Sequence, residues 1–250
     1  MLKNRWKTQF TFILLLVSIV LYIFHFILFH EPRFIFKLMI NNLAFAPISV
    51  LFVTLFINQV LEMRTKQERT QKTYLALGTF FHEIGGELIG KMSVLDTGLA
   101  EIMDLVSIDD SWNDDKFISA RKKLTSRRAR LSPDGKGLAE LGSYIVRHKW
   151  HLTNMLSNPV LMEHEALTDM LWSTYHLAME FDARKGTKSL SEADIEHMTS
   201  DTERSYNLLC VEWMEYMRHL KEEYSYLYSF AIRNNPFYTG RKKIRTESKE

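Results

Sequence analysis

Two long apolar runs stand close together near the start of the chain. The first, from Gln9 to Phe29, contains no acidic or basic side chain apart from the titratable His25, and the second, from Leu38 to Ile57, contains no charged residue. An α-helix rises about 1.5 Å per residue, so about 20 apolar residues cross a hydrocarbon core of about 30 Å. The runs therefore predict two transmembrane helices, at about 9–30 and 36–58.

A cleaved signal peptide is the alternative interpretation, because it also combines a basic start with an apolar stretch. The first run is longer than the apolar region of roughly 7 to 15 residues that is typical of signal peptides, and no small-residue cleavage motif follows it. Pro32, in the short connection His30-Glu31-Pro32-Arg33, disfavours helix at the residue before it and is expected to end the first span. We therefore expect a permanent anchor in the lipid bilayer.

The orientation of the anchor follows from its flanking basic residues, because loops that are rich in Lys and Arg stay in the cytoplasm. Lys3, Arg5 and Lys7 precede the first span, and only Arg33 and Lys37 lie in the connection. Arg64, Lys66, Arg69 and Lys72 follow the second span. The sequence thus predicts a multi-pass protein of the cell (inner) membrane with both termini in the cytoplasm.

Composition limits the rest of the chain. A formal net charge of +2 argues against binding of polyanions through overall charge, and the single Cys210 excludes an intramolecular disulfide or a zinc site built on several thiolates. Alternating runs of Val, Ile and Thr are missing, which argues against a β-rich domain. We expect an all-α membrane protein, in which a two-helix transmembrane hairpin is followed by a cytoplasmic helical bundle with a long stalk helix. The expected parts are a cytoplasmic N-terminus (1–8), the hairpin (9–61), the stalk and bundle (62–237) and a disordered basic tail (238–250).

The stalk is expected to continue the second span and to carry a heptad-like seam. Apolar residues recur there at alternating steps of three and four, which is typical of a helix that packs along one face or forms a coiled coil. These are Leu77, Phe81, Ile84, Leu88, Met92, Leu95, Leu99, Ile102 and Val106. The seam is the reason to expect a homo-oligomer. Further helices are predicted at 112–130, 137–157 and 160–183, and a long one from a capping box at Ser189-Leu190-Ser191-Glu192 to Asn234.

Three polar residues inside the spans are functional candidates, because polar groups are costly in hydrocarbon. His25 in the first span and Asn41 and Asn42 in the second lie at similar depth in an antiparallel hairpin. One interpretation is an interhelical hydrogen bond that fixes the hairpin, and the other is a polar ring around a pore in an oligomer. We favour the hydrogen bond, because no acidic or basic residue lies deep in either span.

Gly78, His82, Gly86 and Gly90 recur every four residues along the predicted stalk. Each glycine costs about 1 kcal/mol relative to alanine inside a helix, so the stripe needs a compensating role. Close approach of another helix backbone is the structural interpretation, and a flexible joint that transmits movement from the membrane is the functional alternative.

The segment Phe80-Phe81-His82-Glu83-Ile84 contains an aromatic residue followed by His-Glu and an apolar residue on a predicted helix. It resembles the start of the phospho-accepting H-box of sensor histidine kinases, which also lies below a membrane hairpin. The resemblance implies phosphotransfer at His82. It covers five residues: Gly85-Gly86-Glu87 stand where that family has Arg-Thr-Pro, and its Asn-rich and Gly-rich ATP-binding boxes are missing.

Histidines and carboxylates give only weak metal-site candidates. Neither His82 nor His164 has the second histidine four residues on that a His-Glu-x-x-His zinc motif requires. One helical face, however, carries Glu165, Asp169, His176 and Glu180. Because this face lies nearly opposite the apolar residues of its helix, a solvated surface is expected, and no metal or other cofactor is predicted.

A basic segment is the last candidate. Arg121, Lys122, Lys123, Arg127, Arg128 and Arg130 bring six cations into ten residues. Anionic lipid headgroups are the nearest polyanion, and each nearby Lys or Arg contributes about 1 kcal/mol of attraction to them. Pairing with Asp109, Asp110, Asp114 and Asp115 is the alternative. Nucleic acid is unlikely as a partner because the segment lacks interleaved aromatic residues.

The leading hypothesis from the sequence is a non-enzymatic, oligomeric, membrane-anchored helical scaffold or signal relay, with a cytoplasmic protein partner that the sequence does not identify. A small oligomeric channel or transport component built from the hairpin is the first alternative. A helical enzyme that uses the His/carboxylate face of residues 165–180 is the second. No nucleotide-binding loop or nucleophile motif favours catalysis.

Overall fold

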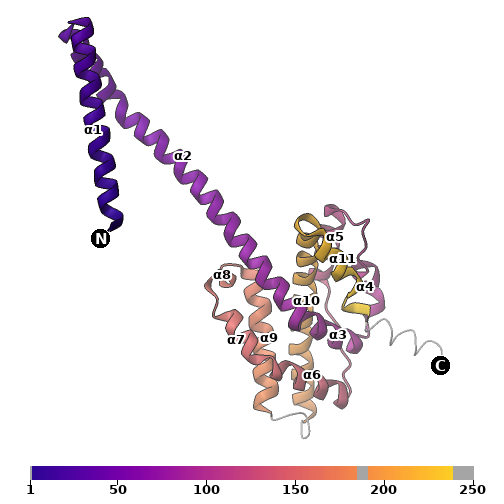
Figure 1. Ribbon diagram of the computed structural model, residues 1–250. Helices are drawn as coiled ribbons and strands as arrows, with labels where there is room; N and C mark the ends of the chain where they lie inside the picture. Colours follow the sequence, from indigo (N-terminus) through magenta and orange to yellow (C-terminus); the bar gives the residue numbers. More distant parts are fainter. Residues whose placement is uncertain (1, 185–190, 239–250) are drawn as a thin grey trace. The chain divides into compact units, whose positions relative to one another are not determined.

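The computed structural model describes residues 2–184 and 191–238, and all regular elements in these residues are helical (Figure 1). The expectation of an all-α protein is thereby confirmed. Of the predicted basic tail, only Tyr238 belongs to the described part; residues 239–250 lie outside it, as does Ser189 of the predicted capping box.

The helices follow one another with short connections. In chain order they are α1 (Leu2–Phe29), α2 (Pro32–Phe80), the π-helical turn η1 (Phe81–Gly85), α3 (Gly86–Leu95), α4 (Leu99–Val106), α5 (Asp114–Ser126), α6 (Gly135–Arg147), α7 (Lys149–Leu156), α8 (Pro159–Met162), α9 (Glu165–Ala183), α10 (Glu192–Glu223) and α11 (Ser225–Arg233). The chain divides into two compact units at the boundary between Lys66 and Gln67.

The N-terminal unit is made of α1 and the first part of α2. By length and composition both helices could cross a membrane: mean hydropathy reaches 2.8 in α1 and 2.0 in α2, and none of these apolar windows is buried in the chain. His30 separates the helices with a left-handed φ of 53°, and Pro32 occupies the first position of α2, where its missing N–H costs nothing. Helix α1 starts at Leu2 and therefore includes residues 2–8, which the sequence predicts as part of the cytoplasmic N-terminus.

Helix α2 is 49 residues long and includes Pro47 in its interior. It continues past the boundary at Lys66 into the second unit, where its last turns become buried at Thr73, Leu77 and Phe80. The polar segment that was expected to continue the second span is therefore helical throughout.

The second unit is a helical bundle around α10. This 32-residue helix packs against α9, α5, α11 and α3, while α9 also contacts α6 and α7. Met198, Tyr206 and Leu209 on α10 are completely buried, as are Leu141 on α6 and Leu171 on α9. Because the apolar residues of α10 face several neighbours, this helix supplies the centre of the core.

The heptad-like seam of residues 77–106 is buried inside this bundle. All nine of its side chains belong to the core, and Leu88, Met92, Leu99 and Val106 are fully inaccessible. The seam does not run along one regular α-helix, because η1 interrupts the α-helical geometry and the break at Asp96 divides the seam. Its apolar face is used within the chain, so it gives no support to a coiled coil between copies.

Three helices that the sequence predicts as continuous are divided in the structure. The predicted helix 160–183 forms α8 and α9, which Glu163 and His164 separate. The segment 137–157 breaks at His148, whose φ and ψ of −96° and 4° separate α6 from α7, and the segment up to Asn234 breaks at Tyr224. The break at His148 still leaves Leu152 of α7 in the core. Periodicity therefore identified the buried faces but not the bends between them.

Side-chain caps begin several helices. Asn113, Asp134 and Asn158 each accept a hydrogen bond from a backbone N–H in the first turn of α5, α6 and α8. Before α10 the capping box is formed by Ser191 and Asp194. The predicted box was placed two residues too early, because Ser191 followed by Asp194 supplies the same reciprocal hydrogen bonds.

Candidate functional site

The most unusual backbone geometry in the described residues is the π-helical turn η1, which joins α2 to α3. The N–H of Gly86 donates to the carbonyl of Phe81, five residues earlier, and the flanking Phe80 and Gly86 both keep right-handed helical angles. Such turns hold one residue more than an α-helical turn and occur frequently at functional sites. His82, from the predicted phospho-accepting motif, lies in this turn and is exposed, with its ring 5.8 Å from that of Phe230 on α11.

Glycines make the turn possible. A Cβ at Gly86 would lie 2.8 Å from the Phe81 carbonyl oxygen, and a Cβ at Gly85 would lie 2.6 Å from the Phe80 ring and 2.7 Å from the Phe81 ring. Because the carbonyl of Phe81 is also the acceptor of the π hydrogen bond, a side chain at position 86 opposes the closure of the turn itself.

The four residues of the predicted glycine stripe do not share one neighbour. A Cβ at Gly78 would meet the phenol of Tyr216 on α10 at 3.2 Å, His82 is exposed, Gly86 faces its own turn and Gly90 is buried. At Gly78 the close neighbour is thus an aromatic side chain and not a helix backbone. Of the four residues, Gly86 is the one whose missing side chain the geometry of η1 requires.

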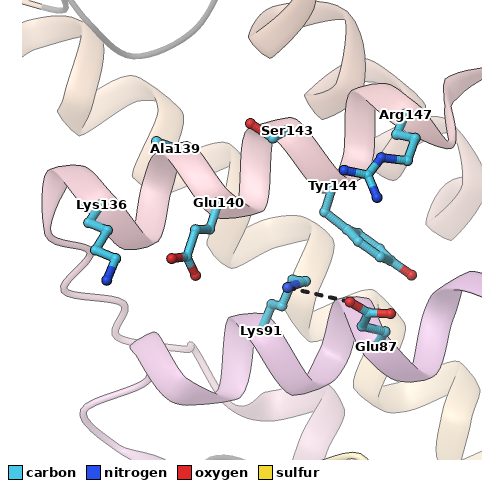
Figure 2. A pocket seen from close by; sticks show the side chains of 8 residues that line it. All are labelled: Glu87, Lys91, Lys136, Ala139, Glu140, Ser143, Tyr144 and Arg147. Carbon is cyan, nitrogen blue, oxygen red and sulfur yellow. Dashed lines mark ion pairs between the residues drawn. The ribbon is translucent and has the colours of Figure 1, made fainter.

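A shallow groove of about 380 Å³ lies between α3 and α6, close to this turn (Figure 2). It is lined by Glu87 and Lys91 from α3 and by Lys136, Ala139, Glu140, Ser143, Tyr144 and Arg147 from α6. Lys91 forms an ion pair with Glu87 at 3.4 Å. The groove is open, and its charges are mixed.

Tyr144 connects the groove to the π-turn. Its hydroxyl donates a buried hydrogen bond of 3.1 Å to the carbonyl of Ile84, and the Lys91 ammonium lies 5.3 Å from its ring centre. Burial, with a smaller contribution from Glu87, raises the pKa of the Tyr144 hydroxyl far above its usual value. The hydroxyl therefore keeps its proton and acts as a donor toward the turn.

The weak metal candidates on α9 separate into two pairs. Glu165 and Asp169 are exposed, whereas His176 and Glu180 face α10. One carboxylate oxygen of Asp201 on α10, Oδ2, lies 3.3 Å from His176 Nε2 and 3.4 Å from His197 Nε2. Glu180 forms an ion pair with Arg184. Across residues 2–184 and 191–238, no group of three or more His, Cys, Asp or Glu side chains is arranged to hold a metal ion. This cluster brings side chains of α9 and α10 into contact.

The six cations of the basic segment have different surroundings. Arg127 is partly buried and forms an ion pair of 2.6 Å with Asp96. Arg130 pairs with Glu101, and Arg121 lies 3.6 Å from Glu215. None of these partners belongs to the acidic cluster of residues 109–115 that was considered. Lys122, Lys123 and Arg128 are exposed, and no ion pair with another described residue involves them. Of the six cations, these three are the exposed ones that form no ion pair with another described residue.

The polar residues of the spans are not brought together in the single chain. The His25 ring lies 4.7 Å from that of Phe29 and stacks 6.2 Å from that of Phe34, and its Nδ1 has no hydrogen-bond partner. Asn41 and Asn42 are exposed on α2. The interhelical hydrogen bond expected for the hairpin is therefore not formed here.

Comparison with known proteins gives matches to both units. A family model described as "MJ1433, N-terminal helical domain" matches residues 2–61, and one described as "Uncharacterized protein MJ1433, C-terminal helical domain" matches residues 69–233. "Uncharacterized protein MJ1433" of Methanocaldococcus jannaschii is 34% identical over 234 residues, which cover 94% of each chain. This chain belongs to the MJ1433 family. No solved structure matches it.

In this MJ1433-family chain, sequence reasoning missed Tyr144 as a link between helices. Its spacing on α6 placed it near the apolar face, and nothing in the sequence showed that its hydroxyl would reach Ile84, 60 residues away. The same holds for Tyr74 of α2, whose ring stacks 3.5 Å from that of His219 and whose hydroxyl donates to Glu215. Only the tertiary fold brings these partners together.

Proposed function

We propose that this MJ1433-family chain is a membrane-anchored helical scaffold or signal-relay protein. In this proposal α1 and the first part of α2 span the cell (inner) membrane, both termini lie in the cytoplasm, and the bundle presents a surface to a cytoplasmic protein. The activity is non-enzymatic.

The observation that carries the proposal is the opposite environment of apolar side chains in one continuous helix. In α2, apolar side chains before Lys66 such as Leu51 and Phe52 are 58% and 73% exposed. After Lys66, Leu77 and Phe80 are only 2% and 1% exposed. Exposed apolar surface of this extent requires a nonaqueous solvent or a partner. A single helix that enters the core of the bundle is also suited to carry movement along its axis.

We also propose that the chain forms an oligomer, through a different surface from the seam that the sequence suggested. The seam of residues 77–106 is covered within the chain, so a homo-oligomer would form through the exposed faces of α1 and α2. In such an assembly His25, Asn41 and Asn42 could find partners across copies, because helix association in lipid uses interhelical hydrogen bonds. Cross-linking in lipid nanodiscs tests this part, and a strictly monomeric chain would remove it.

Anionic lipid headgroups are proposed as a second contact, through Lys122, Lys123 and Arg128. In nanodiscs with anionic headgroups, hydrogen exchange of residues 119–128 should be slower than in nanodiscs with zwitterionic headgroups. Lys122→Glu together with Lys123→Glu should abolish the difference, because the attraction depends on charge. Equal exchange in both lipids would remove this contact.

Topology mapping tests the proposal as a whole. A fluorescent reporter fused after Glu250 should be active in the cytoplasm, and a reporter that is active only outside the cytoplasm should work when inserted after Glu31. Membranes washed at alkaline pH should retain the chain. Release of the chain by this wash, or a cytoplasmic reporter signal at Glu31, would show that the hairpin does not span the membrane.

A further inference from the structure

The helix that begins at Pro32 does not stop at Phe80. Helical structure continues to Leu95 through η1, and Phe80 and Gly86 on its two sides have φ and ψ near those of an α-helix. The chain therefore stays helical through η1 while one turn contains an extra residue. Each residue of an α-helix corresponds to a rotation of about 100°, so the position of this extra residue sets the rotation of α2 relative to α3.

The sequence of the π-turn lowers local helix stability. It contains two adjacent glycines, each of which costs about 1 kcal/mol relative to alanine in a helix. A side chain at Gly86 would press on the Phe81 carbonyl at 2.8 Å. The chain thus keeps a weak and sterically permissive turn at the point where α2 enters the core.

A contact from outside the helix holds this turn. The Tyr144 hydroxyl of α6 donates to the Ile84 carbonyl, and the bond is buried. The ring of Tyr144 forms part of the groove in Figure 2, opposite Glu87 and Lys91 of α3. The hydroxyl of Tyr144 therefore contacts the π-turn from within the bundle, while the same residue lines the groove.

We propose that η1 is a register switch between two states. In the first state the turn is π-helical and Tyr144 is bonded to Ile84. In the second state the turn is α-helical, the extra residue has moved into α2, and α2 is rotated by about 100° relative to α3. The inference deepens the proposed relay function, because this rotation is the movement that α2 would exchange between the membrane and the bundle.

Spin-label distances in the full chain, held in nanodiscs, test the switch. Labels at Thr79→Cys on α2 and Asp169→Cys on α9 occupy exposed positions on either side of the turn. The native Cys210 stays in place, because it is buried and burial raises the pKa of its thiol, which makes it unreactive. Rotation by about 100° at a side-chain radius of about 5 Å would move the Thr79 label by about 8 Å.

Two variants should move the distance distribution. Tyr144→Phe removes only the hydroxyl and should add a second distance component, displaced by several ångströms. Gly86→Ala opposes the π hydrogen bond and should increase the same component further. Gly135→Ala, where a Cβ meets nothing within 4 Å, is the control and should leave the distribution unchanged.

An unchanged distribution in Tyr144→Phe would overturn the register switch. That variant keeps the ring and adds no atom, so its result does not depend on whether Gly86→Ala folds. Both labels lie after Lys66, in the second unit, and the readout therefore does not require the hairpin to cross a membrane. A shift in a chain that topology mapping shows to be unanchored would leave the switch in place and remove the membrane relay.

Discussion

The two units of the chain use apolar residues in opposite ways. Helix α1 is apolar on all sides, and its Ile13 and Leu14 are 60% and 54% exposed. In α3, by contrast, Leu88 and Ile89 are fully buried. A helix that is apolar all round suits lipid, and one with an apolar stripe suits a water-facing bundle. The difference shows that the arrangement of apolar residues, more than their number, decides which solvent a helix requires.

Separating the units should have the largest effect on this comparison. Residues 67–250, expressed without the hairpin, should be recovered in the soluble fraction, because the exposed apolar surface of the spans is removed and the bundle has its own core. The full chain should need detergent. Sedimentation of both forms, followed by thermal unfolding of the fragment, measures the effect. A fragment that aggregates or shows no cooperative transition would mean that the bundle depends on the hairpin.

A second large effect is expected at the buried ion pair between Arg127 and Asp96. The Asp96 side chain is completely buried and that of Arg127 is 12% exposed, so Arg127→Ala leaves an uncompensated charge inside the protein. Loss of about 3–5 kcal/mol of unfolding free energy is expected. The control is Arg130→Ala, whose pair with Glu101 is exposed and contributes about 0–1 kcal/mol. Equal losses in urea titrations of both variants would contradict this assignment.

Matched leucine substitutions compare the units directly. Leu88→Ala should destabilise the bundle by about 2–5 kcal/mol, because it leaves a cavity in a packed core. Leu51→Ala, at a position that is 58% exposed, should leave the unfolding of the bundle unchanged. Urea titration in detergent, followed by the fluorescence of the bundle tryptophans, measures both. A similar loss at Leu51 would indicate that the two units unfold together.

Periodicity and composition predicted the all-α fold and the buried face of residues 77–106. They predicted the second span and its polar continuation as helical, because a long run without a breaker has few alternatives. The breaks at His148 and Tyr224 were not predictable, since neither residue is a strong helix breaker and both bends are set by packing. The depth, number and orientation of spans in lipid stay predictions.

The candidate sites were predicted less completely than the fold. Six neighbouring cations look alike in the sequence, yet Arg127 is partly buried against Asp96, 31 residues earlier, and Lys122 is exposed. Likewise, the glycines suggested close helix packing, whereas Gly86 serves a π-turn whose hydrogen bond spans five residues. Partners far apart in the sequence and local changes of hydrogen-bond register leave no periodic signal.

The smallest expected effect is a pH-dependent change in stability that comes from a buried carboxyl group in the bundle. Burial raises the pKa of Glu212 on α10 to about 6, from 4.5, although Arg121 lowers it in part. Since the neutral form is favoured in the folded state, Glu212 contributes most to stability below about pH 4.5. That contribution is lost as the pH rises through 6, and amounts to about 2 kcal/mol.

Glu212→Gln should therefore raise the unfolding free energy by up to about 2 kcal/mol at pH 7.5 and change it little near pH 4, because glutamine keeps the shape without the charge. Glu222→Gln, at an exposed position of the same helix, is the control. Urea titrations of both variants across pH 4 to 8 give the measurement. If Glu212→Gln lowers stability at pH 7.5, the carboxylate is held by a favourable interaction, and α10 tolerates a charge in the core of the bundle.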